Sequence, residues 1–570
     1  MNQAPGNSPS PLQKVLDYHQ ATKHALQRYA SGPGCLDWSN QPNPFRRYED
    51  TRLILLDLPP PSNEPLYDNA FAQGRISPTS PNFSSISQLF YNSLAISAWK
   101  STGETRWALR VNPSSGNLHP TEGYLICGPV EGLCDKPMVS HYAPKEHGLE
   151  VLTEFDLGLW KQLGASLPKG SCFMVLTSIH WREAWKYGQR GYRYCQHDAG
   201  HAIAAISLAA AGQGWQARIL DDLSTNELAL LTGTFRKHDA ESEEPDVLIA
   251  LSPSTETTNQ VGLPAEAILA FATLDWRGRP NHLSPSHVDW GMEEIALAVR
   301  KPRGSSWYDR SQSQPKPRPL QPGPLQPGPL QPGPLKHSPL DARPVALYKM
   351  IRQRRSAVAM DAETSISRDT FFRIMQKTLA VPGSIPFGTL PWKPHIHLAL
   401  FVHRVDDLAP GLYILVRAPA QKKALEAALT QADSWRRPPG CPEQLELYCL
   451  IAADARNVAR QIACSQSIAS DSCFSLSMIA EYQASLSSYG PAFYPRLFWE
   501  AGVIGQVLYL EAEAAGIRST GIGCFFDDSM HEVLGLEGSQ YQDLYHFTIG
   551  GPIEDTRLTT LPSYLDEPRS

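Results

Sequence analysis

KYGQRGYRYCQHDAGHAIAAISLAAAGQG at residues 186–214 and SYGPAFYPRLFWEAGVIGQVLYLEAEAAG at residues 488–516 are two versions of one segment, 302 positions apart. They align without a gap, and the matched positions are Lys186-Tyr187-Gly188 with Ser488-Tyr489-Gly490, Tyr192 with Tyr494, Asp198-Ala199-Gly200 with Glu500-Ala501-Gly502, Leu208 with Leu510 and Gly214 with Gly516. This register predicts a tandem duplication, which has to be recognised before any single motif is interpreted. A functional site is therefore to be sought where the two copies meet.

Length and composition set the class of protein. A chain of 570 residues is too long for one hydrophobic core, and 42% hydrophobic with 19% charged residues is typical of soluble globular domains. The net charge of −6 gives no electrostatic footprint for nucleic acid or an anionic membrane. The first residues lack a secretory signal, and the longest apolar run, 199–211, is shorter than the roughly 20 residues of a membrane span. We expect a cytoplasmic protein with no membrane or nucleic-acid partner.

The ten cysteines are scattered without a C-x-x-C pair, so they are expected to be buried thiols, with no disulfide and no structural zinc. His197 and His201 have the i,i+4 spacing of metal ligands on a helix. No third ligand shares a motif-like spacing with them, so we predict no metal site.

A change of composition divides the chain. Leu-Gln-Pro-Gly-Pro occurs three times between residues 320 and 334, and such proline-rich repeats stay extended at about 3.1 Å per residue. We predict a spacer here, with a docking motif for a proline-recognising partner as the alternative. The predicted organisation is a disordered tail (1–17), a first domain (18–302), the proline-rich linker (303–344), a second domain (345–561) and a tail (562–570).

Both domains have the same predicted order of elements, which favours an α+β fold over a Rossmann fold. An amphipathic helix follows an Ile-Ser pair in each, with Ser87 and Ser367 as N-caps. Short β-rich runs come next (123–127, 172–179, 396–402 and 445–451), followed by a helix that is apolar on nearly every face (199–213 and 501–515). Asp221-Asp222 and Asp527-Asp528 are predicted to cap the helix that follows.

Three segments carry candidate chemistry. Arg352 to Ser356 offers clustered guanidinium groups that match a phosphate, or else forms a solvated basic turn. The glycines of segment 516–523 allow a ligand to approach the backbone closely, or else form a helix end and turn. Segment 110–120, RVNPSSGNLHP, is dense in small donors and acceptors and can orient a heteroaromatic ring, or else is a turn.

Together these segments resemble the nitroreductase superfamily of FMN-dependent oxidoreductases. The first domain is similar to its SagB-type azoline dehydrogenase branch in Tyr18-His19-Gln20-Ala21-Thr22-Lys23-His24, in the loop from Arg110 to Gly116 and in Lys186-Tyr187. The second domain has the motifs Arg354-Arg355-Ser356 and Gly521-Ile522-Gly523-Cys524-Phe525. The resemblance spans nearly the whole chain outside the tails and linker. It implies two tandem nitroreductase-like domains that pair as an intramolecular pseudo-dimer, with FMN as cofactor.

In this family FMN lies at a two-fold interface, with the Arg-Arg-Ser motif and glycine loop from one subunit and the Pro-Ser-x-x-Asn loop from the other. The cofactor-binding residues that this implies are Arg110, Pro113, Ser114, Ser115 and Asn117 from the first domain and Arg354, Arg355, Ser356, Gly521, Ile522 and Gly523 from the second. Each of these two sets of residues is complete in only one of the two domains.

Each domain lacks what the other keeps. The first has only Arg75 at the position of the Arg-Arg-Ser motif, and its glycine loop is shorter: Gly214 to Asp222 spans 8 positions, against 12 from Gly516 to Asp528. The second has residues 379–394 where the first has the Pro-Ser-x-x-Asn loop. We therefore predict one intact FMN site per chain and a vestigial opposite site.

Lys186 and Tyr187 are the predicted catalytic residues. Removing a hydride from a carbon of an azoline ring requires a base for the accompanying proton, and a lysine desolvated beside a flavin can serve. Tyr187 would hold or relay that proton. The alternative is a surface lysine before a core tyrosine, and the second copy has Ser488 in place of the lysine. His201 is expected to pack near the flavin or substrate.

Three functions remain open at this stage. The first is an FMN-dependent dehydrogenase or oxidase acting on a small molecule or on azoline rings of a modified peptide. The second is a nitro- or quinone reductase with NAD(P)H as a further partner. The third is a degenerate, non-catalytic peptide-binding or scaffold protein. The sequence leaves open the substrate, the electron acceptor and whether two chains associate further.

Overall fold

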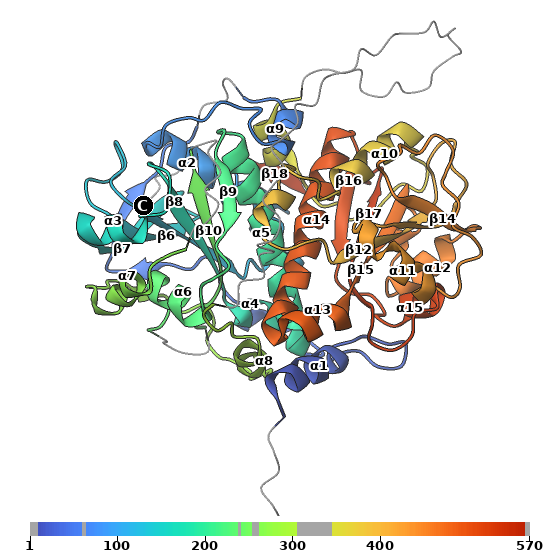
Figure 1. Cartoon of the computed structure of the whole chain (residues 1–570), viewed down its shortest axis with the longest axis horizontal. Helices are drawn as coiled ribbons and strands as arrows, with labels where there is room; N and C mark the ends of the chain where they lie inside the picture. Colours follow the sequence, from blue (N-terminus) through green and yellow to red (C-terminus); the bar gives the residue numbers. More distant parts are fainter. Residues whose placement is uncertain (1–8, 60–63, 237–240, 254–261, 305–344, 565–570) are drawn as a thin grey trace, which may run out of the picture.

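The structure is a computed structural model that describes residues 9–59, 64–236, 241–253, 262–304 and 345–564. The repeated Leu-Gln-Pro-Gly-Pro segment lies outside the described residues, so the predicted linker is not tested. We call residues 9–304 the first half and residues 345–564 the second half. Figure 1 shows the first half in blue to green and the second in yellow to red.

The first half contains a seven-stranded sheet in which every neighbouring pair of strands is antiparallel. Its strands, in spatial order, are β2 (Arg52–Leu55), β7 (Gly148–Glu154), β6 (Met138–Ala143), β5 (Thr121–Cys127), β8 (Cys172–Ser178), β10 (Glu244–Ser252) and β9 (Gln216–Ile219). A separate pair joins β1 (Tyr48–Glu49) to β11 (Arg279–Pro280).

The second half contains a six-stranded antiparallel sheet with the same topology. Its spatial order is β14 (Leu447–Ala452), β13 (Gly411–Leu415), β12 (Ile396–Val402), β15 (Phe474–Ala480), β17 (Gln542–Gly550) and β16 (Arg518–Ile522). Strand for strand this repeats β7-β6-β5-β8-β10-β9, and β2 is the one addition in the first sheet. The predicted α+β fold with two tandem domains is confirmed.

Helices cover the sheets and fill the space between them. Those of the first half are α1 (Pro11–Ala21), α2 (Phe83–Tyr91), α3 (Leu157–Leu163), α4 (His180–Tyr187), α5 (Gly191–Ala211), α6 (Thr225–Thr232), α7 (Ala265–Leu269) and α8 (Met292–Ala298). Those of the second half are α9 (Leu347–Gln353), α10 (Arg368–Lys377), α11 (Lys422–Ala428), α12 (Arg456–Ile462), α13 (Tyr482–Tyr489), α14 (Tyr494–Ala514) and α15 (Ser529–Leu534). The paired helices α4–α5 and α13–α14 are the segments whose sequences match.

Helices α5 and α14 pack side by side between the two sheets (Figure 1). Every residue of α5 is buried, as is nearly every residue of α14, so the prediction of helices buried on most faces is confirmed. The helices cross at Gly200 and Gly502, which are equivalent in the duplication: a Cβ on Gly200 would lie 2.9 Å from the Cα of Gly502. Next to the crossing, the Trp499 indole donates a hydrogen bond of 2.7 Å to Gln196.

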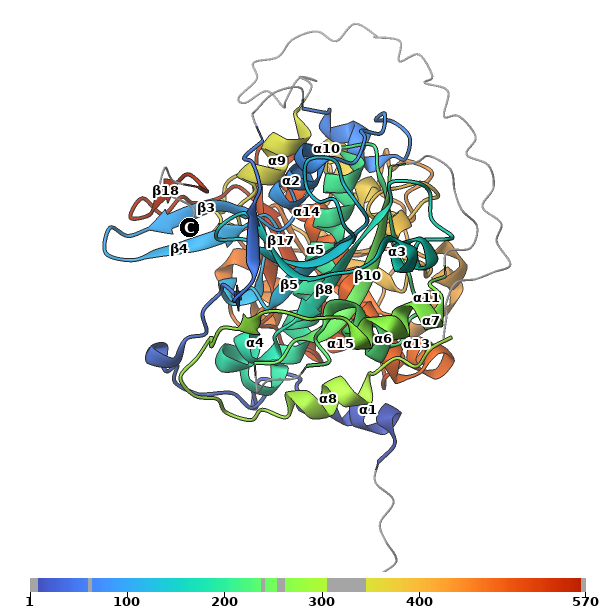
Figure 2. The same ribbon diagram turned by 90° about the vertical axis from the view of Figure 1, so that its left-hand side faces the viewer.

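Each half also extends a terminal segment over the other. Helix α1 lies under the second half (Figure 1), where Lys23 pairs with Asp528 at 2.7 Å and His19 bonds with Tyr494 and Gln542 at 3.1 Å each. At the other end, β18 (Thr559–Leu561) adds to the hairpin β3 (Ile96–Ser101) and β4 (Arg106–Arg110) of the first half (Figure 2). The two halves are thus tied together at three separate places.

Parts of both predicted tails are ordered. Helix α1 begins at Pro11 with Ser10 as its N-cap, so the disordered tail predicted to end at residue 17 is wrong from residue 11 onward. The C-terminal tail predicted from residue 562 packs onto the first half as far as Tyr564, whose hydroxyl donates to the carbonyl of Pro144 at 2.8 Å. Both segments are ordered by contacts with distant parts of the chain, which local composition does not reveal.

Two of the predicted helix caps are also corrected. Ser367 caps α10 as predicted, but Asn82 caps α2, and Ser87 instead lies inside the helix and donates to the carbonyl of Asp57. Asp221-Asp222 does not cap α6, because Ser224 does. Asp528 is the N-cap residue of α15 as predicted, although its side chain forms no cap bond there.

Asp527 has a different role, because its carboxylate pairs with Arg190 at 2.8 Å and Arg193 at 2.7 Å, across the interface between the halves.

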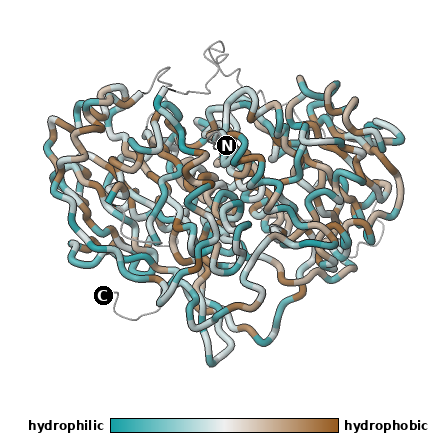
Figure 3. The backbone as a smooth tube through the Cα atoms, turned by 90° about the horizontal axis from the view of Figure 1, so that it is seen from below, coloured by the Kyte–Doolittle hydropathy of each residue, from teal (hydrophilic) through white to brown (hydrophobic). Residues whose placement is uncertain are grey.

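Hydrophobic segments run through both halves (Figure 3), and one core cluster of buried side chains includes residues from each. Within the described residues, no helix is both long and apolar enough to cross a membrane.

Candidate active site

A cavity of about 470 Å³ lies between the two halves, within the range of about 300–1,000 Å³ typical of small-molecule sites. Every predicted site residue except Lys186 lines it. The lining from the first half includes Arg110, Asn112, Pro113, Ser114, Ser115, Gly116, Asn117, His119, Tyr187, Tyr194, Asp198 and His201. The lining from the second half includes Arg354, Arg355, Ser356, Gln466, Tyr509, Gly521, Ile522, Gly523, Cys524 and Tyr545. Neither half builds this cavity alone.

The wall from the first half is the loop between β4 and β5. It contains a 3₁₀ turn (Ser115–Asn117) in which Gly116 and Asn117 both have φ near +60°. Glycine and asparagine tolerate this left-handed region better than other residues. The Asn117 side chain donates to the carbonyl of Ala108 at 2.9 Å, and the amide of His119 donates to the Ser114 hydroxyl at 2.8 Å. These bonds fix the loop from within.

The arginine motif at the end of α9 forms the opposite wall. Arg354 is buried, its Nη2 donates to the carbonyl of Arg110 at 3.2 Å, and its guanidinium lies over the ring of Tyr509 at 4.8 Å. Its Nε and Nη1 are buried and have no hydrogen-bond partner among the described residues. Burial lowers the pKa of this guanidinium. A buried cation with unused donors fits an anionic group such as a phosphate.

Arg355 and Arg352 differ from Arg354 in their contacts. Arg355 lines the cavity, but its Nη1 donates to the carbonyls of Arg352 at 2.9 Å and Arg354 at 2.7 Å, and burial lowers its pKa to about 10. Arg352 does not line the cavity. It donates to the carbonyls of Tyr91 at 2.7 Å and Ile96 at 2.9 Å, so it joins the halves rather than facing a ligand.

The glycine segment meets two tyrosines at close range. The Tyr509 hydroxyl accepts from the amide of Gly521 at 3.1 Å and bonds with the Ser356 hydroxyl at 2.8 Å, which joins the two motifs of the second half. A Cβ at Gly521 would lie 2.1 Å from the Tyr545 hydroxyl, and one at Gly523 would lie 2.1 Å from the ring of Tyr194. Both glycines are therefore required by the packing of the cavity wall.

Lys186 and Tyr187 end helix α4 beside the loop between β4 and β5 (residues 111–120), which we call the ring loop. A Cβ on Gly116 would lie 2.7 Å from the Tyr187 hydroxyl and 3.0 Å from the Lys186 Nζ, so both polar atoms lie against this loop. Lys186 is half-buried rather than fully desolvated. One turn earlier, Glu183 is fully buried, and neither of its carboxylate oxygens has a hydrogen-bond partner among the described residues. Burial, and then repulsion from Asp198, raise the pKa of Glu183.

Asp198 is a lining residue whose role the sequence did not reveal. Its carboxylate accepts from the Ser115 amide at 3.0 Å and from the Ser115 hydroxyl at 3.0 Å, so it holds the ring loop onto α5. No Lys or Arg forms an ion pair with it in the described part of the chain. Its equivalent, Glu500, pairs instead with Arg417 at 2.5 Å. Burial raises the pKa of Asp198 to about 7.

This pKa predicts a pH-dependent stability that Asp198→Asn removes. The folded chain keeps a proton on Asp198 that the unfolded chain releases above its ordinary pKa of 3.8. Stability is therefore lost as the pH rises toward about 7, by up to roughly 4 kcal/mol. Asparagine carries no charge, and its amide oxygen still accepts from Ser115.

The measurement is urea unfolding of wild type and Asp198→Asn at about pH 5 and about pH 8. We expect the free energy of unfolding of the variant, relative to wild type, to increase between the two pH values. A difference that stays constant across this range would mean that Asp198 is ionised throughout.

Several other lining residues were not among the predicted ones. Asn112 and His119 belong to the loop that was singled out, and the Asn112 Oδ1 is buried without a partner among the described residues. The only sequence signal for Tyr194 was its mismatch with Arg496 in the repeat. His201 lines the cavity as expected and bonds with Tyr545 at 3.2 Å, and burial lowers its pKa to about 3. No cluster of three or more metal-ligating side chains occurs among the described residues.

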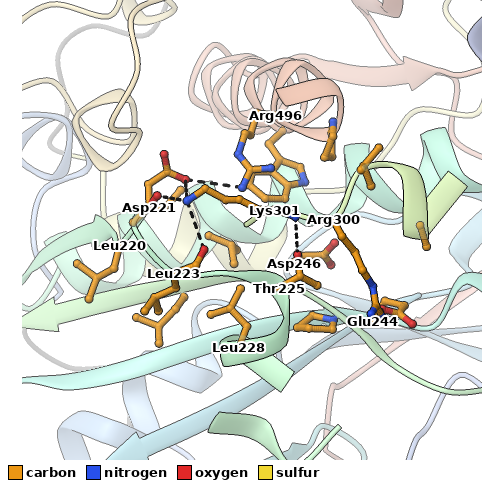
Figure 4. A pocket seen from close by; sticks show the side chains of 18 of the residues that line it. Leu220, Asp221, Leu223, Thr225, Leu228, Glu244, Asp246, Arg300, Lys301 and Arg496 are labelled. Atoms are coloured by element: carbon orange, nitrogen blue, oxygen red, sulfur yellow. Dashed lines mark hydrogen bonds and ion pairs between the residues drawn. The ribbon is translucent and has the colours of Figure 1, made fainter. Parts of the chain in front are cut away.

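The position equivalent to the glycine segment, on the other side of the α5–α14 pair, holds a small pocket lined by a cluster of charged side chains (Figure 4). There Ile219, Leu220 and Asp221 stand where the other side has Gly521, Ile522 and Gly523, and Arg496 stands for Tyr194. Lys301 donates to the carbonyl of Asp221, and its Nζ lies 3.5 Å from the Asp221 carboxylate.

Arg496 joins this cluster, with its Nη2 3.6 Å from the same carboxylate and its guanidinium over the Trp499 ring at 4.7 Å. The space that remains is about 40 Å³, far below that of a small-molecule site. Arg75, the first half's match to the arginine motif, is exposed and does not line this space. The two sides of the duplication are therefore unequal in volume as well as in sequence.

Comparisons with known proteins agree with this architecture. Residues 351–551 match the Nitroreductase family. A crystal structure from Anabaena variabilis, assigned as a nitroreductase, superposes with a TM-score of 0.63 over 95% of this chain and 99% of its own, at 19% identity. The chain therefore has a nitroreductase-like fold, and the likeness extends over both halves.

Two further solved structures are similar to parts of the chain. A protein from Ralstonia eutropha, assigned as a nitroreductase, covers 40% of this chain and 98% of its own at 16% identity, with a TM-score of 0.27. The E. coli microcin synthetase McbBCD, solved with truncated pro-MccB17 bound, covers 44% of this chain and 84% of its own at 17% identity, with a TM-score of 0.25. No curated protein sequence matches the chain.

Proposed function

We propose that the chain is an FMN-dependent oxidoreductase with one flavin site, in the cavity between its halves. The observation that carries this proposal is the inequality of the two equivalent positions: one is a cavity of about 470 Å³, and the other retains about 40 Å³. The larger one combines the arginine motif and glycine segment of the second half with the ring loop of the first. The family resemblance implies the same distribution of these motifs between two subunits.

The residues present fit the two ends of FMN. Arg354 offers two buried donors for the phosphate, with Arg355 and Ser356 beside it. The ring loop, held by Asp198, offers the Asn112 side-chain amide oxygen and the Ser114 hydroxyl to the polar edge of the isoalloxazine. When bound, FMN would supply a two-electron acceptor or donor.

For the substrate we propose an azoline ring in a modified peptide, on the basis of Lys186 and Tyr187. Lys186 would accept the proton that leaves with the hydride, and the Tyr187 hydroxyl, which lies against the same loop, would hold it at the mouth of the site. The buried acid Glu183 lies on the same helix one turn away, where the charge of Lys186 partly opposes the burial that raises the pKa of Glu183. Residues 18–24 also resemble the azoline dehydrogenase branch. They support the substrate assignment less directly than Lys186 and Tyr187, because they pack onto the second half.

Lys186→Ala should retain flavin and lose turnover. General-base catalysis contributes about 10²- to 10⁴-fold to a rate, so we expect a loss of this size in the oxidation of a synthetic thiazoline-containing peptide. The exposed Lys161 supplies a matched control, and Lys161→Ala should behave as wild type. Unchanged turnover in Lys186→Ala would remove this lysine from the mechanism.

The two alternative functions predict different experimental results. Rapid anaerobic bleaching of the bound flavin by NADPH, with no response to azoline peptides, would favour a nitro- or quinone reductase. Protein that binds no flavin at all would favour a peptide-binding or scaffold role. The buried, unused donors of Arg354 are the structural observation against that third function.

A further inference from the structure

Two thiols meet on the wall of the cavity. Cys464 follows helix α12 and Cys524 follows strand β16, and their Sγ atoms are 2.9 Å apart. All ten cysteines of the chain are free thiols in the structure. Another pair, Cys127 and Cys134, is wider at 3.9 Å, and Cys127 is fully buried. The separation of the first pair is 1 Å shorter than that of the second, and about 0.9 Å longer than the roughly 2.0 Å of a disulfide bond.

Backbone contacts on both sides hold these thiols together. The amide of Phe526 donates to the carbonyl of Ile462 at 2.8 Å, and the Gln466 side chain donates to the carbonyl of Cys524 at 3.0 Å. Cys464 itself has φ of +52°, a region that a residue with a Cβ seldom adopts. The surrounding structure therefore fixes the position of Cys464 against its local preference.

The two thiols are chemically unequal and accessible. The hydrogen bond with Cys464 lowers the pKa of Cys524, with help from the nearby Arg190 guanidinium and against burial and Asp527, which raise it. Both cysteines are only partly buried, and Tyr29, which bonds with Cys464, is 53% exposed. A thiolate in an electropositive, partly exposed position is the kind that reacts with oxidants.

We propose that Cys464 and Cys524 are a redox-active pair that closes to an intramolecular disulfide on exposure to peroxide. The Cys524 thiolate attacks hydrogen peroxide, which breaks the O–O bond, forms a sulfenic acid and releases hydroxide. The Cys464 thiol then attacks the Cys524 sulfur, and the oxygen leaves as water. In total two thiols lose two electrons and two protons, and one peroxide becomes two waters.

The proposal goes beyond the flavin chemistry and does not depend on it. Gln466 and Cys524 both line the cavity, so a disulfide would lock one part of its wall. In a reducing compartment a disulfide of this kind is usually transient and is reversed by reduction. The structure thus assigns an oxidative modification site to the loop that ends the glycine segment.

The test uses the full chain, reduced, freed of reductant and treated with hydrogen peroxide before its remaining thiols are alkylated. Peptide mass mapping should show a link between the tryptic peptides 461–496 and 519–557, and fragmentation has to separate Cys464 from Cys473 on the first of these. We expect this pair to lose its thiols about ten-fold faster than the half-buried Cys441, and added dithiothreitol to restore both.

Two variants sharpen the result. Cys524→Ser should abolish the link and leave Cys464 open to alkylation, whereas Cys441→Ser should oxidise as wild type. The mapping on wild type does not depend on how well the variants fold. Cys464 and Cys524 that are alkylated independently after peroxide, or that oxidise no faster than Cys441, would overturn the proposal.

Discussion

Gly502→Ala is expected to destabilise the folded chain by about 3 kcal/mol or more, the upper end of the usual cost of overpacking. The new Cβ would lie 2.3 Å from the carbonyl oxygen of His197 and 2.8 Å from the Cα of Gly200. Both are backbone atoms of α5, so no side chain can move aside to make room. Alanine stabilises an isolated helix by about 1 kcal/mol over glycine, which is too little to offset this clash.

The measurement is the urea midpoint, followed by tryptophan fluorescence. Gly388→Ala is the matched control. Among the described residues, no heavy atom apart from those of its chain neighbours lies within 4 Å of the Cβ that alanine would add there, and its φ lies outside the left-handed region. It should leave the midpoint unchanged. If Gly502→Ala is as stable as Gly388→Ala, then α5 and α14 do not cross at the equivalent glycines.

Arg354→Met is expected to weaken FMN binding by about 100-fold. Removing the charged partner of a buried ion pair costs about 2–5 kcal/mol, or roughly 30-fold to several thousand-fold in affinity. Without ligand, however, the Arg354 guanidinium is a buried cation with two unused donors. Its replacement by a side chain of similar length should therefore not destabilise the apoprotein.

Arg352→Met supplies the control from the same motif. Arg352 lies two residues away, outside the cavity, and bonds with the carbonyls of Tyr91 and Ile96. Its loss should lower the stability of the chain and leave the FMN dissociation constant unchanged. The two variants are compared by fluorescence titration with FMN and by urea unfolding of the apoproteins. Equal effects of both on FMN affinity would mean that Arg354 does not contact the phosphate.

Most of the fold could be predicted from the sequence repeat. The ungapped match at Gly200 and Gly502 pointed to two equivalent helices, and these glycines are the residues at which the helices touch. The strand runs, such as 396–402, were visible because they are short and mostly apolar. By contrast, α1 and β18 owe their order to contacts with the opposite half. No local pattern encodes such contacts, which is why both ends were predicted as tails.

The candidate site was predictable to the extent that its residues lie in motifs. The ring loop, the arginine motif and the glycine segment do line one cavity, and the Arg-Arg-Ser motif separated Arg354 from Arg352, which charge clustering alone had grouped together. Asp198 was not among the predicted site residues, because the repeat matches it with another acid, Glu500, and nothing in the sequence separates the two. Only the contacts distinguish them, since Glu500 pairs with Arg417 and Asp198 holds the ring loop.

The count of flavins per chain tests the central claim most directly. The apoprotein is titrated with FMN, freed of unbound flavin, and assayed for flavin absorbance against chain concentration from amino-acid analysis. One cavity is large enough and its equivalent is filled by the cluster of Asp221, Lys301 and Arg496, so the account predicts close to one FMN per chain. Two FMN per chain would contradict the composite single site, and none would contradict the flavin assignment itself.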